Sequence, residues 1–374
     1  MLAMRRAAVA TCLLLAGLGL CTESARACNV PVFRYALERW PPAPYEVFVF
    51  HRGPLSPDAQ QIVTDLRTRG RTDADDEAAA INLLVTDLDA APGAAARKLW
   101  DASPGATAPW LIVRYPAFLG IDGNVWAGPL TRENVAAVMD SPVRRQIARD
   151  LIQGESAVFL LMESGNREKD EAAALLLKKE LAQLEKELEL PEPAAGQWND
   201  PVYDEKGPPK MRLGFEVLRL SRTDPAEQFF VKMLIGPAPD LLKGGEPVVF
   251  PFFGRGRALC AIVGDQISAD RIGEEAAFLI GPCSCIVKDQ NPGLDMLMAV
   301  DWDAALEGQA SAIPTVDPPP PTGLAAFATD AEKAAKADEN ALRASFIRHV
   351  VVAIICGFGL LTLIVLVWRR WRAA

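Results

Sequence analysis

Two cysteines separated by a single residue, Cys283 and Cys285, have the residue type and spacing that most directly suggest chemistry. On an extended strand the side chains of residues i and i+2 point to the same side, so these two thiols can meet. A disulfide that closes so small a ring is strained, and strained disulfides are more readily reduced. Cys283 and Cys285 are therefore candidate catalytic residues for thiol–disulfide exchange.

The same thiols allow two other interpretations. Together with Cys260 or Cys28 they could hold a soft metal ion such as Cu(I) or Zn(II), because such ions prefer thiolate ligands. Alternatively, one of them bridges Cys260 or Cys28 and the other is buried and inert. No histidine and no second C-x-C motif stands beside the pair, and Cys260 lies in the apolar string RALCAIVG. We therefore expect structural cysteines, and no metal or other cofactor.

His51 and a glycine–arginine turn are the remaining candidates. A Ser-His-Asp relay would have to use His51, because the other histidine, His349, borders an apolar C-terminal run. The chain lacks the G-x-S-x-G and H-E-x-x-H motifs, which favours a hydrogen-bonded turn histidine. Arg255 and Arg257, in the string GRGR, could bind a carboxylate or phosphate. Their position between two predicted strands indicates first a hairpin turn. No complete catalytic motif emerges, and we favour a protein that is not an enzyme.

The C-terminus predicts a membrane anchor. Val350 to Trp368 is a run of 19 residues without a charge. A helix that rises about 1.5 Å per residue needs about 20 such residues to cross the hydrocarbon core. Arg369, Arg370 and Arg372 follow directly, and the positive-inside rule places that end in the cytoplasm. Everything before the span is then predicted to be extracytoplasmic.

The N-terminus agrees with this orientation. Arg5 and Arg6 precede an apolar stretch at 7–20, and an A-x-A cleavage site ends at Ala27. These features predict a secretory signal peptide at 1–27. Cleavage would leave Cys28 as the first residue, which also admits N-terminal acylation of its thiol. Arg26 does not suit a lipoprotein cleavage site, however.

Composition excludes two classes of partner. The signal and the C-terminal segment contain six of the 39 basic residues and one of the 48 acidic residues. The extracytoplasmic part is thus left with 33 basic and 47 acidic residues, a net charge of −14. Such a surface repels nucleic acid and anionic lipid headgroups. A protein partner is the remaining expectation.

Hydrophobic periodicity predicts two units with one order of elements, which suggests a tandem repeat. The first unit has a strand at 46–50, a helix at 57–69, strands at 81–86, 109–116 and 124–128, and helices at 132–139 and 142–152. The second has strands at 156–162, 213–220, 247–253 and 258–263, with helices at 168–190 and 269–280. Ser56, Thr131 and Ser268 are predicted N-caps. A short helix is expected at 294–300.

This element order resembles the thioredoxin fold, twice over. Family members carry a cis-proline before the third strand, and Pro109 and Pro247 stand at the matching points. The C-x-x-C motif of active thioredoxins is absent, because the matching positions read Arg-Gly-Pro-Leu at 52–55 and Glu-Ser-Gly-Asn at 163–166. The resemblance therefore implies domains that bind or space partners without dithiol chemistry. The string CNVPVFRYALERW is similar to bacterial membrane-anchored proteins, which implies no activity.

The predicted fold class is α/β, with two tandem thioredoxin-like domains followed by one transmembrane helix. The predicted segments are a signal peptide at 1–27, the domains at 28–152 and 153–305, a Pro/Ala-rich stalk at 306–345, the span at 346–368 and a cytoplasmic tail at 369–374. The expected function is a noncatalytic binding or scaffold protein of the bacterial inner membrane. It would be accessory to a larger membrane complex.

Overall fold

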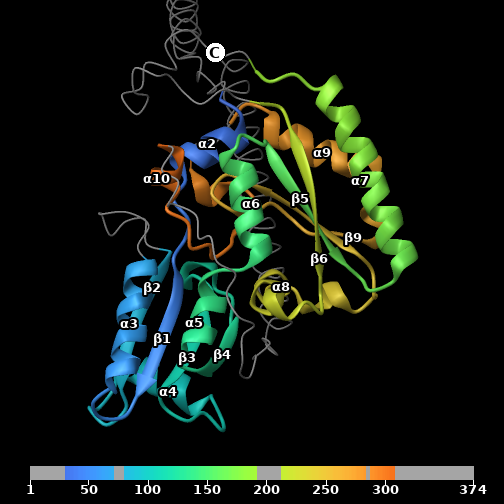
Figure 1. Ribbon diagram of the computed structural model, residues 1–374. Coiled ribbons are helices and arrows are strands. Elements are labelled where there is room, and N and C mark those ends of the chain that lie inside the picture. The colour runs from blue at the N-terminus through green and yellow to red at the C-terminus, as the bar shows by residue number, and fades with distance from the viewer. Residues whose placement is uncertain (1–29, 71–79, 192–211, 284–286, 308–374) are drawn as a thin grey trace, which may run out of the picture.

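The computed structural model describes residues 30–70, 80–191, 212–283 and 287–307. These residues form a mixed α/β structure with two mixed sheets (Figure 1). None of the helices they form is both long enough and apolar enough to cross a membrane. The predicted signal peptide, stalk, membrane span and tail lie outside the described residues, as do Cys28 and Cys285.

The first sheet has four strands in the order β2-β1-β3-β4. They are β1 (Tyr45–His51), β2 (Ile81–Asp87), β3 (Trp110–Arg114) and β4 (Trp126–Pro129). β2 runs parallel to β1, whereas β3 runs antiparallel to both β1 and β4. Because strand side chains alternate between faces, Tyr45, Val47 and Val49 are all buried on one face. The predicted strand at 46–50 is confirmed, with one further residue at each end.

The second sheet has six strands and repeats this arrangement. They are β5 (Ala157–Glu163), β6 (Phe215–Ser221), β7 (Val248–Phe253), β8 (Arg257–Ala258), β9 (Ile262–Val263) and β10 (Leu294–Asp295). β6 is parallel to β5 and β7 is antiparallel to it. The order is β10-β8-β7-β5-β6, and β9 also pairs with β7. Every residue of β7 is buried, since both faces of this sheet are covered.

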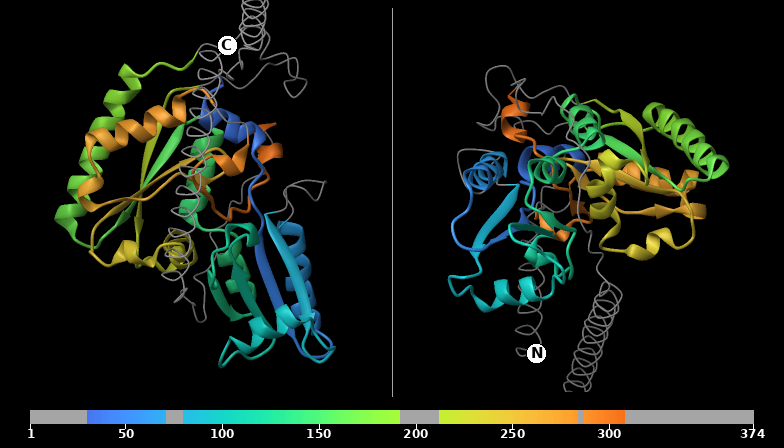
Figure 2. Two further views of the ribbon diagram at one scale, coloured as in Figure 1. Left: turned by 180° about the vertical axis from the view of Figure 1, so that it is seen from behind. Right: turned by 60° about the horizontal axis from the view of Figure 1, so that its bottom comes forward.

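Helices cover both faces of each sheet. On the first sheet, α3 (Pro57–Gly70) and α5 (Arg132–Met139) pack on one face and α4 (Ala94–Asp101) on the other. On the second sheet, α2 (Val32–Arg39), α7 (Arg167–Glu187) and α9 (Ala269–Ile280) share one face, and α6 (Pro142–Ile152) and α8 (Gln228–Ile235) the other. Figure 2 shows α7 and α9 on the side of the second sheet that faces away from the first.

The described ranges also contain short 3₁₀ helices: η2 (Ala117–Leu119), η3 (Pro225–Glu227), η4 (Pro239–Leu242), η5 (Gly264–Gln266) and η6 (Lys288–Gln290). The predicted N-caps are confirmed. Thr131 and Ser268 accept hydrogen bonds from the amides of Asn134 and Arg271, and Ser56 accepts one from the amide of Ala59. Each cap satisfies one of the amides that a helix N-terminus leaves without an intrahelical acceptor.

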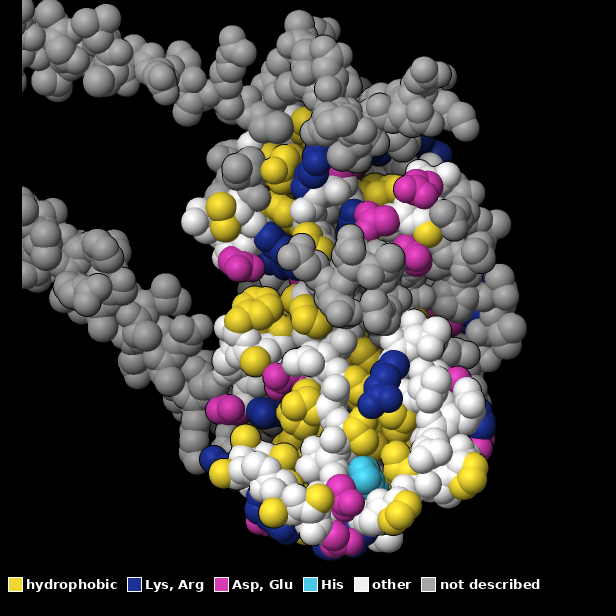
Figure 3. All heavy atoms as spheres, turned by 90° about the vertical axis from the view of Figure 1, so that its left-hand side faces the viewer, with side chains coloured by type: hydrophobic (Ala, Val, Ile, Leu, Met, Phe, Trp, Pro, Cys, Tyr) yellow, Lys and Arg dark blue, Asp and Glu magenta, His cyan; other side chains and the backbone are white. Residues whose placement is uncertain are grey.

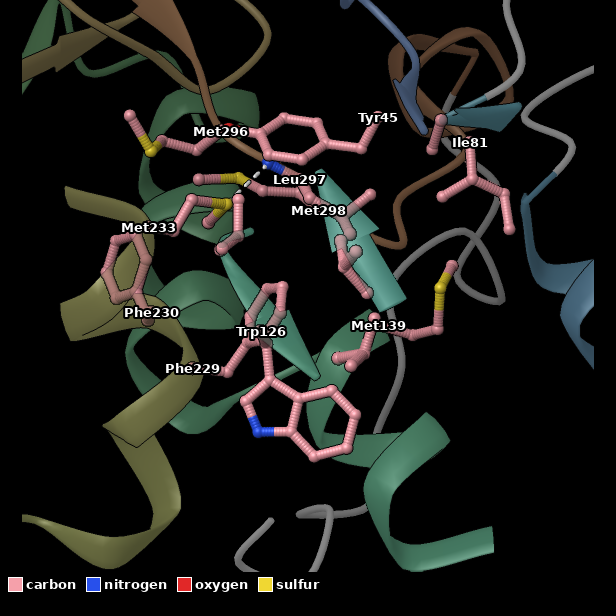
Figure 4. Packing of buried hydrophobic residues seen from close by; sticks show 14 of the residues in the cluster. Tyr45, Ile81, Trp126, Met139, Phe229, Phe230, Met233, Met296, Leu297 and Met298 are labelled. Carbon is pink, nitrogen blue, oxygen red and sulfur yellow. Dashed lines mark hydrogen bonds between the residues drawn. The ribbon is translucent and has the colours of Figure 1, made fainter. Parts of the chain in front are cut away.

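One apolar core joins the two sheets. It contains Val47 and Val113 from the first sheet and Leu160 and Phe250 from the second. Between them lies a group of large side chains, drawn in Figure 4: Tyr45, Trp126, Met139, Phe229, Phe230, Met233, Met296, Leu297 and Met298. The Tyr115 hydroxyl donates to the carbonyl oxygen of Met233 in α8, at 2.9 Å. The two sheets are therefore held together by a continuous interior.

The segment at 294–301 crosses this core, and the helix predicted at 294–300 is wrong. The chain forms β10 and then runs on without helical structure until α10 (Trp302–Leu306) begins. Its backbone groups bond to other segments: the amide of Met296 to the Gly256 carbonyl at 3.1 Å, and that of Ala299 to the Met139 carbonyl at 3.2 Å. These long-range partners replace the bonds that a helix would make internally.

Arg144 of α6 satisfies the backbone at the centre of this junction. The residue is 1 % exposed, and burial lowers the pKa of its guanidinium to about 10, so the group stays charged at neutral pH. It donates to the carbonyl oxygens of Ala137, Val138 and Leu297 at 2.6, 2.9 and 2.9 Å, and to the Ser141 hydroxyl at 3.0 Å. Its guanidinium carbon also lies 5.3 Å from the centre of the Phe229 ring.

Replacing Arg144 by methionine should destabilise the protein strongly. Methionine fills much of the same space but leaves three buried carbonyl groups without a donor, which costs about 3–5 kcal/mol in comparable buried sites. Urea unfolding of residues 28–345, followed by tryptophan fluorescence, measures the change. Arg149→Met, on the half-buried side of the same helix, is the matched control and should cost less than about 1 kcal/mol. Equal losses in the two variants would contradict this role.

Candidate functional site

A pocket of about 370 Å³ opens where β1 leads into α3. Three short segments line it. His51 ends β1 and the loop to α3 follows with Arg52 and Leu55; Trp100 lies at the end of α4, and residues 107–109 lead into β3. Figure 3 shows a histidine at this surface with hydrophobic side chains beside it. The lining thus combines an apolar wall with a few polar groups, as small binding sites commonly do.

Hydrogen bonds to the end of β2 and the residue after it fix the loop that borders the pocket. Gly53 has a φ of +58°, a left-handed conformation that glycine adopts without steric cost. Its amide donates to the Asp87 carboxylate at 3.1 Å, and the amide of Leu88 donates to the His51 carbonyl at 2.8 Å. The end of β2 therefore holds the loop that follows β1.

The imidazole of His51 has a defined tautomer. Its Nδ1 lies 2.7 Å from the carbonyl oxygen of Gly53, and a carbonyl can only accept, so Nδ1 carries the proton. In the neutral ring, Nε2 then keeps a lone pair and can accept a hydrogen bond. Within the described part of the chain this is the only hydrogen bond of the ring, and no serine or carboxylate is bonded to it. The ring therefore makes the predicted hydrogen bond to the turn that follows, although His51 itself is the last residue of β1.

The charge at the rim is balanced. Arg52 donates to the Asp89 carboxylate at 2.7 Å, and both side chains are about half exposed. Exposed ion pairs of this kind contribute little to stability, on the order of 1 kcal/mol or less. Arg52 can therefore exchange this partner for a ligand at small cost.

The opposite rim presents unpaired backbone. Among the described residues, neither the amide nor the carbonyl group of Thr107 or Ala108 has a hydrogen-bond partner, although the chain here approaches β3. Both residues line the pocket, and Thr107 is exposed. Such groups can pair with the backbone of an extended ligand, as an unpaired strand edge does.

The corresponding loop of the second unit is closed on itself. It joins β5 to α7, and the buried Asp170 accepts hydrogen bonds from the Ser164 amide and hydroxyl, both at 2.7 Å, and from the Gly165 amide at 3.0 Å. These bonds occupy the polar groups of the loop. Of these two loops, the β1–α3 loop of the first unit is therefore the one that remains available to a ligand.

The two proline predictions have different outcomes. The Ala108–Pro109 peptide bond is cis, as predicted. The Glu246–Pro247 bond is trans, so the cis-proline predicted there is wrong. Trans is the default form of a peptide bond. Glu246 has two partners here: Arg222 donates to its carbonyl oxygen, and Lys169 pairs with its carboxylate.

The two arginines of the GRGR string have internal partners. Arg255 donates to the Leu37 carbonyl at 2.8 Å and to Asp303 at 2.6 Å. Arg257 pairs with Asp295 at 2.8 Å, and both of these residues are buried. The predicted hairpin turn joins β7 to β8. Arg255 and Arg257 therefore fasten α2, α10 and β10 to the second sheet, and neither guanidinium group is presented to an external anion.

The described cysteines do not form a site. Cys260 and Cys283 are not bonded to each other, and Cys283 is 1 % exposed. Burial, reinforced by the nearby Glu275 carboxylate, raises the pKa of the Cys260 thiol to about 12. No group of three or more potential metal ligands occurs within the described ranges. Cys285, the other half of the predicted pair, lies outside them.

The sequence did not indicate Trp100 or Thr107. Both belong to the connection between β2 and β3, where α4 was not predicted although its eight residues are strongly amphipathic. The helical spacing of Ala96, Leu99 and Trp100 was the available signal, since these side chains pack on the sheet together. Comparison with known proteins adds no assignment: no family model, curated protein or solved structure matches the chain.

The raised pKa of Cys260 has a direct consequence for its reactivity. At pH 8 almost none of the folded thiol is ionised, and the thiolate is the species that reacts with iodoacetamide. We expect Cys260 to be alkylated at least tenfold more slowly in the folded protein than in urea, as measured by peptide mass mapping over time. Glu275→Gln removes the nearby negative charge and should speed the reaction. Equal rates in folded and unfolded protein would contradict the raised pKa.

Proposed function

We propose that this protein is a membrane-anchored, extracytoplasmic binding or scaffold protein without catalytic activity of its own. Its two units would be tandem thioredoxin-like domains, the C-terminal span would anchor them in a bacterial inner membrane, and the first unit would bind a protein partner. The strand orders β2-β1-β3-β4 and β6-β5-β7 followed by β8 or β9, with helices on both faces, support the domain assignment.

The pocket beside His51 carries the proposal. It combines an apolar wall, a histidine with an available lone pair and backbone groups of Thr107 and Ala108 without described partners. An extended peptide segment would satisfy this backbone through strand-like hydrogen bonds, while one of its side chains would enter the pocket. No cysteine lies in the loop, so the site offers binding without thiol chemistry.

The alternative, a thiol–disulfide enzyme or soft-metal binder using Cys283 and Cys285, has weaker support. A reactive thiol needs access to solvent and a lowered pKa. Cys283 is buried, and the pKa of Cys260 is raised rather than lowered.

Filling the pocket should abolish partner binding. In Thr107→Trp, an indole ring would occupy the rim and cover the backbone of Ala108. We expect at least a tenfold loss of the captured partner, equivalent to about 1.4 kcal/mol. The measurement is quantitative mass spectrometry of proteins cross-linked to the full-length chain in its own membrane. Lys179→Trp, on the exposed side of α7, is the matched control. Identical capture by the Thr107→Trp and wild-type chains would refute the pocket assignment.

The anchor can be tested independently of the pocket. A chain that ends at residue 345 lacks the predicted span and should appear in the soluble extracytoplasmic fraction, with the same partner bound. The full-length chain should resist extraction with alkaline carbonate. A truncated chain that stays in the membrane fraction would show that another segment provides the anchor.

A further inference from the structure

β2 is a free edge of the first sheet. It pairs with β1, and among the described residues no second strand lies on its other side. The left view of Figure 2 shows this strand (light blue) on the side of the first sheet that lies away from the second sheet. A free edge presents a row of unpaired amide and carbonyl groups, which can pair with a further strand.

Hydrogen bonds at the two ends of β2 show which of its backbone groups face this edge. The residues just before and just after the strand, Ala80 and Leu88, bond to the first and last residues of β1 at 3.1 and 2.8 Å. Every second residue of a strand bonds to the same neighbour, so the even-numbered residues of β2 bond to β1. The amide and carbonyl groups of Leu83 and Val85 are therefore directed toward the free edge.

The side chains of β2 leave this edge unprotected. The six residues from Ile81 to Thr86 include no charged residue and no proline. Leu84 is 39 % exposed, and its neighbours Leu83 and Val85 are half-buried. Proteins usually protect a free edge with charged side chains, with proline or by keeping the strand short.

Other edge strands within the described ranges have such protection. β6, at the edge of the second sheet, carries exposed charges at Glu216 and Arg219, and Arg219 pairs with Glu163 and Glu171. β4, at the other edge of the first sheet, has four residues and ends at Pro129. The contrast identifies β2 as the edge that is open to association.

The residues of β2 match an antiparallel copy of the same strand. Leu84 is the middle one of its seven residues. One step away on either side are Leu83 and Val85, which are both apolar, and two steps away are Asn82 and Thr86, which are both polar and uncharged. In a copy that is centred on Leu84 and runs in the opposite direction, apolar residues face apolar residues and the Asn82 amide faces the Thr86 hydroxyl. Such a self-complementary surface is typical of two-fold symmetric dimers.

This register also satisfies the outward backbone groups. Leu83 of one copy lies opposite Val85 of the other, and residues paired in this way exchange two hydrogen bonds. Leu84 lies opposite its own copy in the closer kind of pair, with Cα atoms about 4.5 Å apart. Because Phe48 of β1 is next to Leu84 in the register of the sheet, the apolar row continues across the contact.

Charge permits this contact in spite of the acidic composition of the chain. With a net charge of −9 at pH 7, two copies repel each other over most of their surfaces. The charged residue of β2 is Asp87, at its end, which lies opposite Ile81 in this register, so the two Asp87 carboxylates stay apart. The uncharged strand is thus a place where two copies can approach closely.

We infer that two copies of this chain associate through their β2 strands, which pair antiparallel about Leu84. The two four-stranded sheets then form one continuous sheet of eight strands. One strand pair with a few apolar side chains is a small interface, so the dimer forms in a concentration-dependent manner.

Cysteine cross-linking of the full-length chain tests this pairing. Leu84→Cys places two thiols at a Cα separation of about 4.5 Å, which suits a disulfide. The cell fraction that holds the chain is oxidised with copper phenanthroline and separated on a non-reducing gel. We expect at least tenfold more dimer than in the wild-type chain, which reports the native cysteines. Leu175→Cys, which replaces a leucine of α7 that is 71 % exposed, is the matched control. Equal amounts of dimer in the two variants overturn the inference.

A mixed experiment tests the register. Asn82 of one copy lies opposite Thr86 of the other, whereas each residue is displaced from its own copy by four positions, about 13 Å along the strand. Asn82→Cys and Thr86→Cys expressed together should therefore form the dimer, and either variant alone should give the wild-type level. Cross-linking of a single variant with itself, at the level of the mixture, overturns the register.

Two further outcomes separate the second copy from other occupants. Leu84→Lys places two ammonium groups opposite each other and should reduce the mixed cross-link at least tenfold, whereas Leu175→Lys should leave it unchanged. An undiminished cross-link with Leu84→Lys contradicts the pairing. A Leu84→Cys chain that is cross-linked to a different protein, identified by mass spectrometry of the gel band, overturns the second copy as the partner.

Discussion

The guanidinium group of Arg144 lies in the core that the two sheets share. The packing of the two sheets depends on the hydrogen bonds that this group makes. A buried cation is tolerated only where acceptors surround it. Here the acceptors are carbonyl oxygens at the end of α5 and in the segment at 294–301. This one side chain therefore joins the end of the first unit to the last part of the second. The two sheets share this interior, and each also has a further apolar cluster on its other face.

Two units with the same strand order differ at their β–α loops in the hydrogen bonds that hold those loops. In the second unit, Asp170 turns back onto the loop and accepts its amides. In the first unit, the acceptor comes from outside the helix: Asp87, at the end of β2, holds Gly53. In the first unit, Asp87 fixes the loop from one side, and the other side of the loop stays open. The binding proposal depends on this difference, which is one of hydrogen bonding and not of fold.

Much of the secondary structure was predictable because its causes are local. Strands such as β1 and β5 follow from short apolar runs, and the helices begin at the expected Ser56, Thr131 and Ser268 because those side chains bond to amides three residues away. Two predictions failed. Pro247 was expected to be cis from its place in the order of elements, but the Glu246–Pro247 bond has the default trans form. The segment at 294–300 was expected to be helical, but its hydrogen-bond partners lie far away in the chain.

The sequence by itself determined most of the strands, the helix caps, the acidic balance and the absence of C-x-x-C from both loops, because these depend on residue type and on neighbours a few positions away. The anchor and the signal peptide stay predictions of the same kind. Only the tertiary structure decided that Arg255 and Arg257 are engaged internally, and that Trp100 and Thr107 meet His51 at one pocket. The physical reason is that a polar group is paired or unpaired according to which hydrogen-bond partners the fold places next to it. These partners lie tens to hundreds of residues away in the sequence.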